Sequence, residues 1–284
     1  MADRFVQLLW FILMKCSAGK VMEWLRSMGG RAQGLELARF TGMGRGLKCT
    51  DRVFSESVVL HVPLELILSG QSGNGLASEF KATLSLSDSE AIAFQLVFER
   101  AKGEFSNWAP YISVLPRSAL MTPKGFGQSA LEGLQDRTFL ERGLTARHFC
   151  EASYFRIRER LIPAVRYACQ TSGVPDVAAC VEAHVSLKAW AWALSLIDSR
   201  ALTFKGARYL IPVADLINYA PHPSASTRTF ASGEFFLEHH LLSLNGIEVL
   251  SDRTCEPGSQ FFEDYGDNPT SIYVEHHGLP NFAA

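Results

Sequence analysis

The stretch IPVADLINY, from Ile211 to Tyr219, is an apolar run that carries one carboxylate and ends in Asn218 just before a proline-rich loop. Asp and Asn at the end of a strand often serve only to cap a turn. Asp215 has apolar neighbours on both sides, so we expect it to be largely buried. A buried carboxylate needs a partner, and Arg200 and Arg208 are the natural candidates.

A second stretch, QFFEDYG from Gln260 to Gly266, is predicted to leave the Pro257-Gly258 turn as a strand that ends in an aromatic residue and a glycine. A tyrosine in the position of Tyr265 is, taken alone, more often a core residue whose hydroxyl has a hydrogen-bond partner. The chain then continues through His276 and His277.

Three glycines, Gly42, Gly44 and Gly46, stand in the segment GMGRG. A dinucleotide-binding glycine loop must open a helix, so that the helix N-terminus meets the pyrophosphate. The residues that follow, LKCTDR and VF, predict a strand and no helix, which argues against this class. Two interpretations stay open: a turn between two strands, or a close approach of the backbone to a ligand.

Between these regions the spacing of apolar residues predicts helices. Ser87 and Glu90 match a capping box, and apolar residues three to four apart predict one helix over 145–170 and another over about 177–197. Strand-like runs flank this region and cover residues 35–62, 209–217, 235–237, 241–244, 247–250 and 260–265. Strands at both ends with helices between them indicate an α+β fold in which a helical insertion splits a β-rich domain.

Composition narrows the class of protein. Of 284 residues, 27 are Lys or Arg and 29 are Asp or Glu, a net charge of −2 that argues against a dedicated nucleic-acid binder. The six cysteines form no C-x-x-C pair, and two adjacent histidines, as in His239-His240 and His276-His277, do not face the same way. We therefore predict no metal site and a reducing compartment.

The apolar segment FVQLLWFILM, residues 5–14, is too short to span a membrane as a helix. Two interpretations remain: the start of an amphipathic first helix, or the core of a secretory signal ending near Ala18. Asp3 beside Arg4 is weak for a signal, and we favour the helix. The expected location is cytoplasmic, nuclear or organellar, with secretion or membrane association less favoured.

The order of the pieces is more specific than any one of them. The glycine segment is followed by SNWAPY (106–111), Ser199-Arg200-Ala201, IPVADLIN (211–218) and FEDYG (262–266). This series resembles the SET-domain methyltransferases, in particular the subgroup around Rubisco large-subunit lysine methyltransferase and its SETD-type relatives, over about residues 35–278. The resemblance implies a split β-sheet fold with a helical insert and a pseudoknot-like crossing of the Asn-containing and Tyr-containing segments.

The resemblance also implies a cofactor, S-adenosyl-L-methionine, and assigns residues to it. Tyr265 matches the family's catalytic tyrosine, Asn218 the Asn of its Asn-His pair, and Arg200 the arginine near the cofactor carboxylate. The cofactor site then comprises Gly44, Arg45, Gly46, Arg200, Asp215, Asn218 and Tyr219. Phe262 and His277 would line the substrate channel, and no metal is implied.

Two departures from the family pattern bear on activity. Tyr219 stands where the family has a histidine, and His277 stands where close relatives have a second channel tyrosine. The leading hypothesis is a protein-lysine N-methyltransferase acting on a non-histone protein. The alternatives are a protein-histidine methyltransferase, since the subgroup includes one, and a catalytically weak or inactive SET-fold binding or scaffold protein.

The resemblance also suggests how the chain is organised. We expect an N-terminal helical segment over 1–34 and a SET domain over 35–284, with the helical insert at about 80–198. Relatives usually continue into a helical substrate-binding domain, for which these 284 residues leave no room, so we expect either a fragment or a short form that recognises its substrate by other means. Its expected partner is a protein substrate, with no nucleic acid and no metal, and we expect a monomer.

Overall fold

In the computed structural model, the two stretches that end in Tyr219 and Tyr265 lie side by side. Strand β8 (Asn218–Tyr219) pairs in parallel with β11 (Gln260–Glu263), with Asn218 opposite Phe262 and Tyr219 opposite Glu263. The structure describes residues 19–70, 81–118, 122, 129, 132–133, 136–204, 206–220, 240–243 and 245–265. These residues form two compact units, each of which draws on separate parts of the chain.

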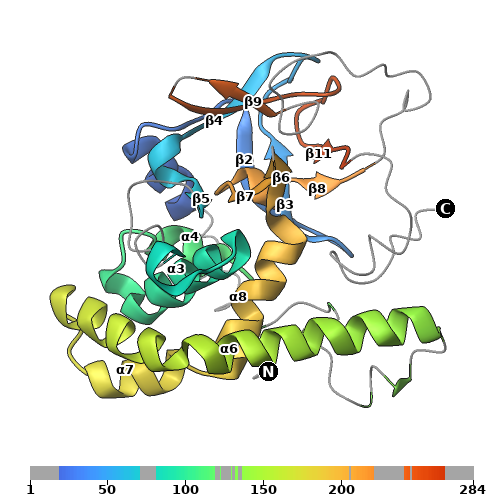
Figure 1. The fold of residues 1–284 in the computed structure, drawn as a ribbon. Coiled ribbons are helices and arrows are strands. Elements are labelled where there is room, and N and C mark those ends of the chain that lie inside the picture. The colour runs from blue at the N-terminus through green and yellow to red at the C-terminus, as the bar shows by residue number, and fades with distance from the viewer. Residues whose placement is uncertain are drawn as a thin grey trace, which may run out of the picture. The chain divides into compact units, whose positions relative to one another are not determined.

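The first unit contains residues up to Ile67 together with Leu202–Phe204 and Ile211–Gly266. Its sheets have the strand orders β1-β4-β10-β9 and β2-β3-β11-β8 (Figure 1). Residues 19–27 form a helix. The strands and 3-10 turns of this unit are β1 (Arg31–Ala32), β2 (Leu35–Phe40), β3 (Gly44–Cys49), β4 (Val58–Pro63), η1 (Leu64–Leu66), β6 (Leu202–Phe204), η4 (Ala214–Leu216), β8, β9 (His240–Ser243), β10 (Gly246–Leu250) and β11.

Strands β2 and β3 form an antiparallel hairpin in which Phe40 stands opposite Gly44. Gly42 therefore lies in the turn between two strands, whereas Gly44 and Gly46 lie on β3, and no helix follows them. The core of this unit is made by apolar side chains that alternate inward from the strands. Fully buried examples are Leu47, Leu60, Val62, Ile247, Val249 and Phe261.

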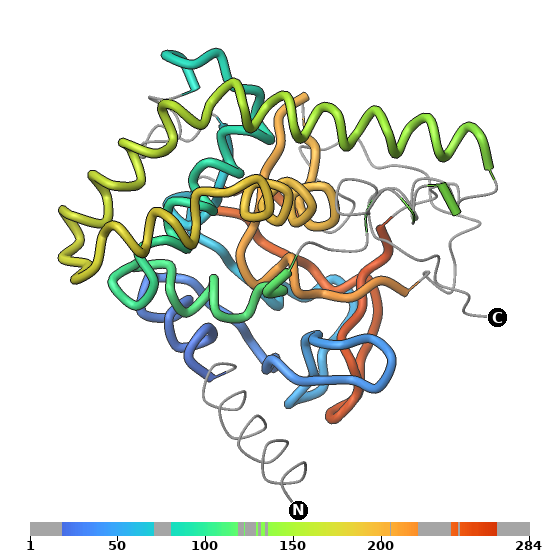
Figure 2. Tube along the Cα trace, turned by 90° about the horizontal axis from the view of Figure 1, so that it is seen from below, coloured from blue at the N-terminus to red at the C-terminus, as the bar shows by residue number. Residues whose placement is uncertain are grey.

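The second unit is built on helices α3 (Asp88–Lys102), α4 (Ala109–Val114), α6 (Arg137–Thr171), α7 (Val177–His184) and α8 (Leu187–Arg200). It also holds η2 (Gly103–Phe105) and the antiparallel pair of β5 (Leu68–Ser69) and β7 (Ala207–Leu210). Helix α6 is one continuous helix that contacts α3, α7 and α8, and its path bends (Figure 2); Pro163 lies inside it.

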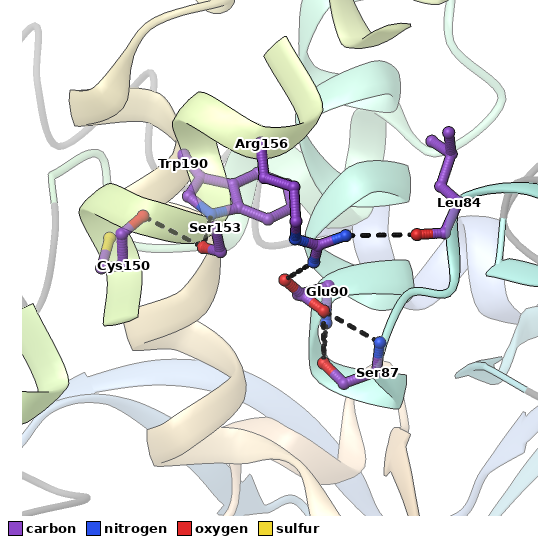
Figure 3. A network of polar contacts seen from close by, with 7 residues as sticks. All are labelled: Leu84, Ser87, Glu90, Cys150, Ser153, Arg156 and Trp190. Carbon is purple, nitrogen blue, oxygen red and sulfur yellow. Dashed lines mark hydrogen bonds and ion pairs between the residues drawn. The ribbon is translucent and has the colours of Figure 1, made fainter. Parts of the chain in front are cut away.

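The predicted capping box is confirmed at the start of α3. The Ser87 side chain accepts from the Glu90 backbone N–H, and the Glu90 carboxylate accepts from the Ser87 N–H. Arg156 on α6 contacts the same carboxylate and donates to the Leu84 carbonyl at 3.1 Å (Figure 3). In the same region Trp190 donates to Ser153 at 2.8 Å. The Arg156 contacts connect the start of α3 to α6, and the Trp190 bond connects α8 to α6.

Two predicted elements differ from the structure. The single helix expected over 177–197 is two helices, because Ser186 caps the N-terminus of α8 by accepting from the Ala189 N–H and so interrupts the pattern. The apolar run 209–217 is not one strand, since η4 replaces its second half. Among the described residues, no helix is long and apolar enough to cross a membrane, and residues 5–14 lie outside them.

Candidate active site

The centre of the candidate site is the crossing of the segments that contain β8 and β11. The Ala220 N–H donates to the Glu263 carbonyl at 3.1 Å and extends the parallel pairing beyond Tyr219. The rings of Tyr219 and Tyr265 lie 5.4 Å apart between centroids with an interplanar angle of 45°. Both tyrosines predicted for the site are therefore together in the first unit, and both are half-buried.

The Tyr265 hydroxyl donates to the Ile217 carbonyl oxygen at 2.5 Å. This bond closes the crossing from the side-chain end, because Ile217 is the residue that ends η4 and leads into Asn218. A hydroxyl held by a short hydrogen bond to a main-chain carbonyl has a fixed position and a fixed proton direction. Two oxygens, one phenolic and one carbonyl, are thus placed next to each other.

The segment before Asn218 carries backbone strain. Val213, at the start of η4, has φ +72° and is fully buried. A β-branched residue rarely adopts a positive φ, because its Cβ meets the following carbonyl oxygen. Such residues persist where the surrounding structure holds them, and they concentrate at functional sites. The positive φ at Val213 changes the direction of the chain between Ile211 and β8.

Asn218 joins the site to the glycine segment. Its Nδ2 donates to the Arg45 carbonyl at 3.0 Å. A Cβ on Gly46 would lie 2.6 Å from both Asn218 Nδ2 and Gln260 Nε2, so these two amide groups occupy the space that the glycine leaves. At Gly44, by contrast, φ is +75° and no described atom lies within 4 Å of the place that a Cβ would take.

The remaining predicted cofactor residues lie in different units. Arg200 is the last residue of α8 in the second unit, whereas Asp215 lies on η4 in the first. Asp215 is mostly buried, as the sequence suggested, and its Oδ1 is inaccessible to solvent. The Arg208 guanidinium lies 3.9 Å from Asp198 and donates to the Ile197 carbonyl at 3.1 Å. Burial lowers the pKa of Arg208.

Side chains on β11 alternate between two faces. Gln260 and Phe262 are half-exposed, whereas Phe261 and Glu263 are 1% and 3% exposed. Phe262 therefore shares a face with Gln260, and Phe261 belongs to the core. The other predicted channel residue, His277, lies outside the described residues.

Sequence reasoning missed one buried contact at this strand. His240 Nε2 lies 2.9 Å from Glu263 Oε1, and both side chains are almost inaccessible, but the oxygen lies off the direction of a straight hydrogen bond. The period-two pattern from Phe261 to Glu263 could have indicated that Glu263 points inward. Within the described residues, no group of three or more His, Cys, Asp or Glu side chains could hold a metal ion.

Solved structures give the class of fold. Rubisco LSMT bound to AdoMet matches with a TM-score of 0.73 at 19% identity, over 94% of this chain and 57% of that chain. The SET domain of LSMT bound to MeLysine and AdoHcy matches with the same TM-score at 18% identity. The chain therefore has the SET-domain fold, and the predicted α+β architecture with crossing C-terminal segments is confirmed.

Curated relatives give a nearer comparison. The chain is 26% identical over 277 residues to the actin-histidine N-methyltransferase of Drosophila melanogaster, and 26% identical over 276 residues to that of Xenopus tropicalis. These matches cover 90% and 92% of this chain but only 47% and 42% of the relatives, so the chain spans less than half their length. No protein-family model matches the chain.

Proposed function

We propose that the protein is an S-adenosyl-L-methionine-dependent protein N-methyltransferase. The observation that carries the proposal is the contact of the Tyr265 hydroxyl with the Ile217 carbonyl at the crossing of two segments in a SET fold. The contact brings together a phenolic oxygen, a main-chain oxygen and two aromatic rings. Methyl transfer requires that kind of environment, since it depends chiefly on positioning.

The first unit offers open space at a glycine and a nearby cationic side chain, which suit the cofactor S-adenosyl-L-methionine. When bound, S-adenosyl-L-methionine supplies an electrophilic methyl group on a positively charged sulfur. Gly44 leaves open space beside a half-exposed Arg45, and the backbone there is held by Asn218. We assign Gly44, Arg45, Gly46, Asn218 and Tyr219 to the cofactor side of the site. Arg200 and Asp215 complete that assignment from the resemblance.

The chain's own residues would act by orientation and exclusion of water. The oxygens of Tyr265 and Ile217 would accept weak C–H···O contacts, which are strongest for a methyl group next to a positive charge. The neighbouring rings of Tyr219 and Tyr265 would keep water away from the line of attack. Phe262, on the half-exposed face of β11, would extend this aromatic surface toward the acceptor.

We propose a histidine side chain of a protein as the acceptor. The curated relatives that match along nine-tenths of the chain are named actin-histidine methyltransferases. An imidazole, whose pKa is about 6.5, is already neutral and nucleophilic at pH 7. A lysine, whose pKa is about 10.4, must first lose its proton. A histidine acceptor therefore needs no general base before the attack, and the methylimidazolium that results loses its N–H proton to solvent afterwards.

Lysine is the second candidate. Ala201 directly after Arg200 resembles the lysine enzymes of the subgroup more than the histidine enzyme. The solved SET structures that share the fold include complexes with lysine and methyllysine. Desolvation between Tyr219 and Tyr265 would favour a neutral lysine amine, because burial disfavours the charged form.

The experiment that tests the proposal is transfer of a radiolabelled methyl group to fractionated lysate proteins and to actin, followed by amino-acid analysis of the product. Labelled N-methylhistidine supports the histidine acceptor, and labelled methyllysine replaces it with the second candidate. Calorimetry with S-adenosylhomocysteine is run in parallel. Absence of both binding and transfer would refute the proposal and leave the scaffold alternative, which Tyr219 and His277 motivate.

A further inference from the structure

Arg253, in the turn that follows β10, contacts several groups at the crossing. Its Nε and Nη2 donate to the two carboxylate oxygens of Asp252, each at 2.7 Å. The same Nη2 donates to the Ala220 carbonyl at 3.1 Å. A planar guanidinium presents donors in a fixed fork, so the Asp252 pair sets its orientation and directs the second N–H of Nη2 to Ala220, the residue after β8.

The surroundings of Arg253 favour a rigid arrangement. The Asp252 side chain is 1% exposed and that of Arg253 is 18% exposed. The pKa of Arg253 is raised, first by its hydrogen bonds to Asp252 and then by the charges of Asp252 and Asp264, while burial acts in the opposite direction. The ion pair with Asp252 is thus the main interaction that holds the guanidinium.

Both backbone polar groups of Ala220 are hydrogen-bonded. Its N–H donates to the Glu263 carbonyl at 3.1 Å, and its carbonyl accepts from Arg253. Strand β8 has only two residues, so its backbone pairing supplies few hydrogen bonds with which to fix the crossing. Arg253 therefore supports both segments through Ala220, whose carbonyl it binds and whose N–H is bonded to Glu263.

We propose that Arg253 is a positioning residue that holds the Tyr219 segment against the Tyr265 segment and thereby sets the place of the Tyr265 hydroxyl beside Ile217. This inference rests on the proposed methyltransferase function for its catalytic consequence, but not for its structural one. Lysine would keep the charge at position 253 without the fork, so it could not serve Asp252 and Ala220 together.

The test compares Arg253→Gln and Arg253→Lys with a matched control, Arg52→Gln. Arg52 is an exposed arginine of the same unit that pairs with Glu256 at 3.2 Å and stands over the Phe54 ring. Four quantities are measured for each variant: kcat and KM of methyl transfer, the Kd for S-adenosylhomocysteine by calorimetry, and the 19F NMR shift of 3-fluorotyrosine placed at position 265. Thermal unfolding confirms that each variant is folded.

We expect both Arg253 variants to lower kcat by about tenfold to 100-fold with KM for the acceptor nearly unchanged, because a misplaced reacting group costs rate more than binding. The 19F resonance shifts or broadens in both variants, and the Arg52 control matches the wild type in every measurement. Arg253→Lys retains more activity than Arg253→Gln but does not restore the wild-type resonance.

An unchanged 19F resonance in a folded Arg253→Gln protein overturns the inference, whatever the enzyme activity. So does a loss of stability that leaves kcat and the resonance as in the wild type, since that outcome marks a structural role only. If the wild-type protein neither binds S-adenosylhomocysteine nor transfers a methyl group, the proposed function fails instead. The 19F comparison still decides the role of Arg253 in that case.

Discussion

The Tyr265 hydroxyl lies 2.5 Å from the Ile217 carbonyl oxygen, although 48 residues separate the two in the chain. Because of this bond, the position of the phenol depends on the path of the backbone through Ile217, and that path depends on the position of the phenol. The bond joins residues just outside two neighbouring strands of one sheet: Ile217 precedes β8 and follows the strained Val213, and Tyr265 lies beyond the end of β11.

Tyr265→Phe removes this bond while it keeps the ring. We expect kcat of the proposed methyl transfer to fall by about 100-fold, because the reacting groups lose an oriented oxygen. The Kd for S-adenosylhomocysteine should stay within about twofold, since the phenol acts on the methyl group and not on the remainder of the cofactor. Steady-state kinetics and calorimetry measure the two effects.

Tyr167→Phe is the matched control, because Tyr167 lies on α6 with its side chain 63% exposed. It should behave as the wild type in both measurements. A Tyr265→Phe protein that transfers methyl groups at the wild-type rate would remove Tyr265 from the catalytic role.

Gly46→Ala tests the close packing on β3. The added Cβ would meet the amide nitrogens of Asn218 and Gln260 at 2.6 Å, so we expect the free energy of unfolding to fall by about 1–3 kcal/mol through overpacking. Urea denaturation measures the change. Gln260→Ala in the same chain should recover part of it, because one of the two crowded amides is gone.

Gly42→Ala serves as the comparison for Gly46→Ala. At Gly42 φ is +77° and no described atom lies within 4 Å of the added Cβ, so the cost there is backbone strain alone, about 1 kcal/mol. If Gly46→Ala proves less destabilising than Gly42→Ala, then the close packing of Asn218 and Gln260 against Gly46 does not limit the side chain at position 46.

The buried contact of His240 with Glu263 predicts strong coupling between the two positions. Glu263→Leu or His240→Leu alone leaves one polar group buried without its partner, and we expect each to lower the free energy of unfolding by about 3–5 kcal/mol. The double variant, with both groups apolar, should be more stable than either single variant. Urea unfolding of the four proteins gives the coupling energy, and strict additivity would show that the contact contributes nothing.

The sequence predicted those parts of the fold that depend on local chemistry. The capping box of Ser87 and Glu90 and the strand from Gln260 follow from residue type and spacing, and both are present. The absence of a helix after Gly46 also followed from local sequence. The crossing itself came from the resemblance to a family, because parallel pairing of Asn218–Tyr219 with Phe262–Glu263 joins residues more than 40 positions apart and leaves no local pattern.

Other features depended on tertiary context that no spacing reveals. Ser186 is equally compatible with an exposed position in a helix and with the cap that divides α7 from α8. The inward direction of Glu263 follows from the alternation on β11, but its partner His240 comes from another sheet. The role of Arg253 depends on where the Ala220 carbonyl points, which is a property of the folded backbone.

Two buried thiols give a prediction about pH. Desolvation raises the pKa of Cys169 and of Cys255 to about 12, with further contributions from the neighbouring Cys180 and Cys49 thiols. At pH 8 only about one thiol in 10,000 is then a thiolate, and the thiolate is the form that reacts. Iodoacetamide should therefore modify both sites very slowly in the native protein, with a rate that rises about tenfold for each pH unit up to about pH 11.

The raised pKa of Cys169 and Cys255 also determines how the free energy of unfolding changes with pH. The folded state holds these protons more tightly than the unfolded chain, in which a cysteine has a pKa of about 8.5, so the stabilisation is complete below pH about 8.5 and is lost as pH rises toward 12. Mass mapping of alkylated peptides, in native buffer and in urea as the unfolded control, measures the reactivity. Alkylation of Cys169 and Cys255 in the native protein as fast as in urea would contradict their burial, and an unfolding free energy that rises above pH 9 would contradict the direction of the shift.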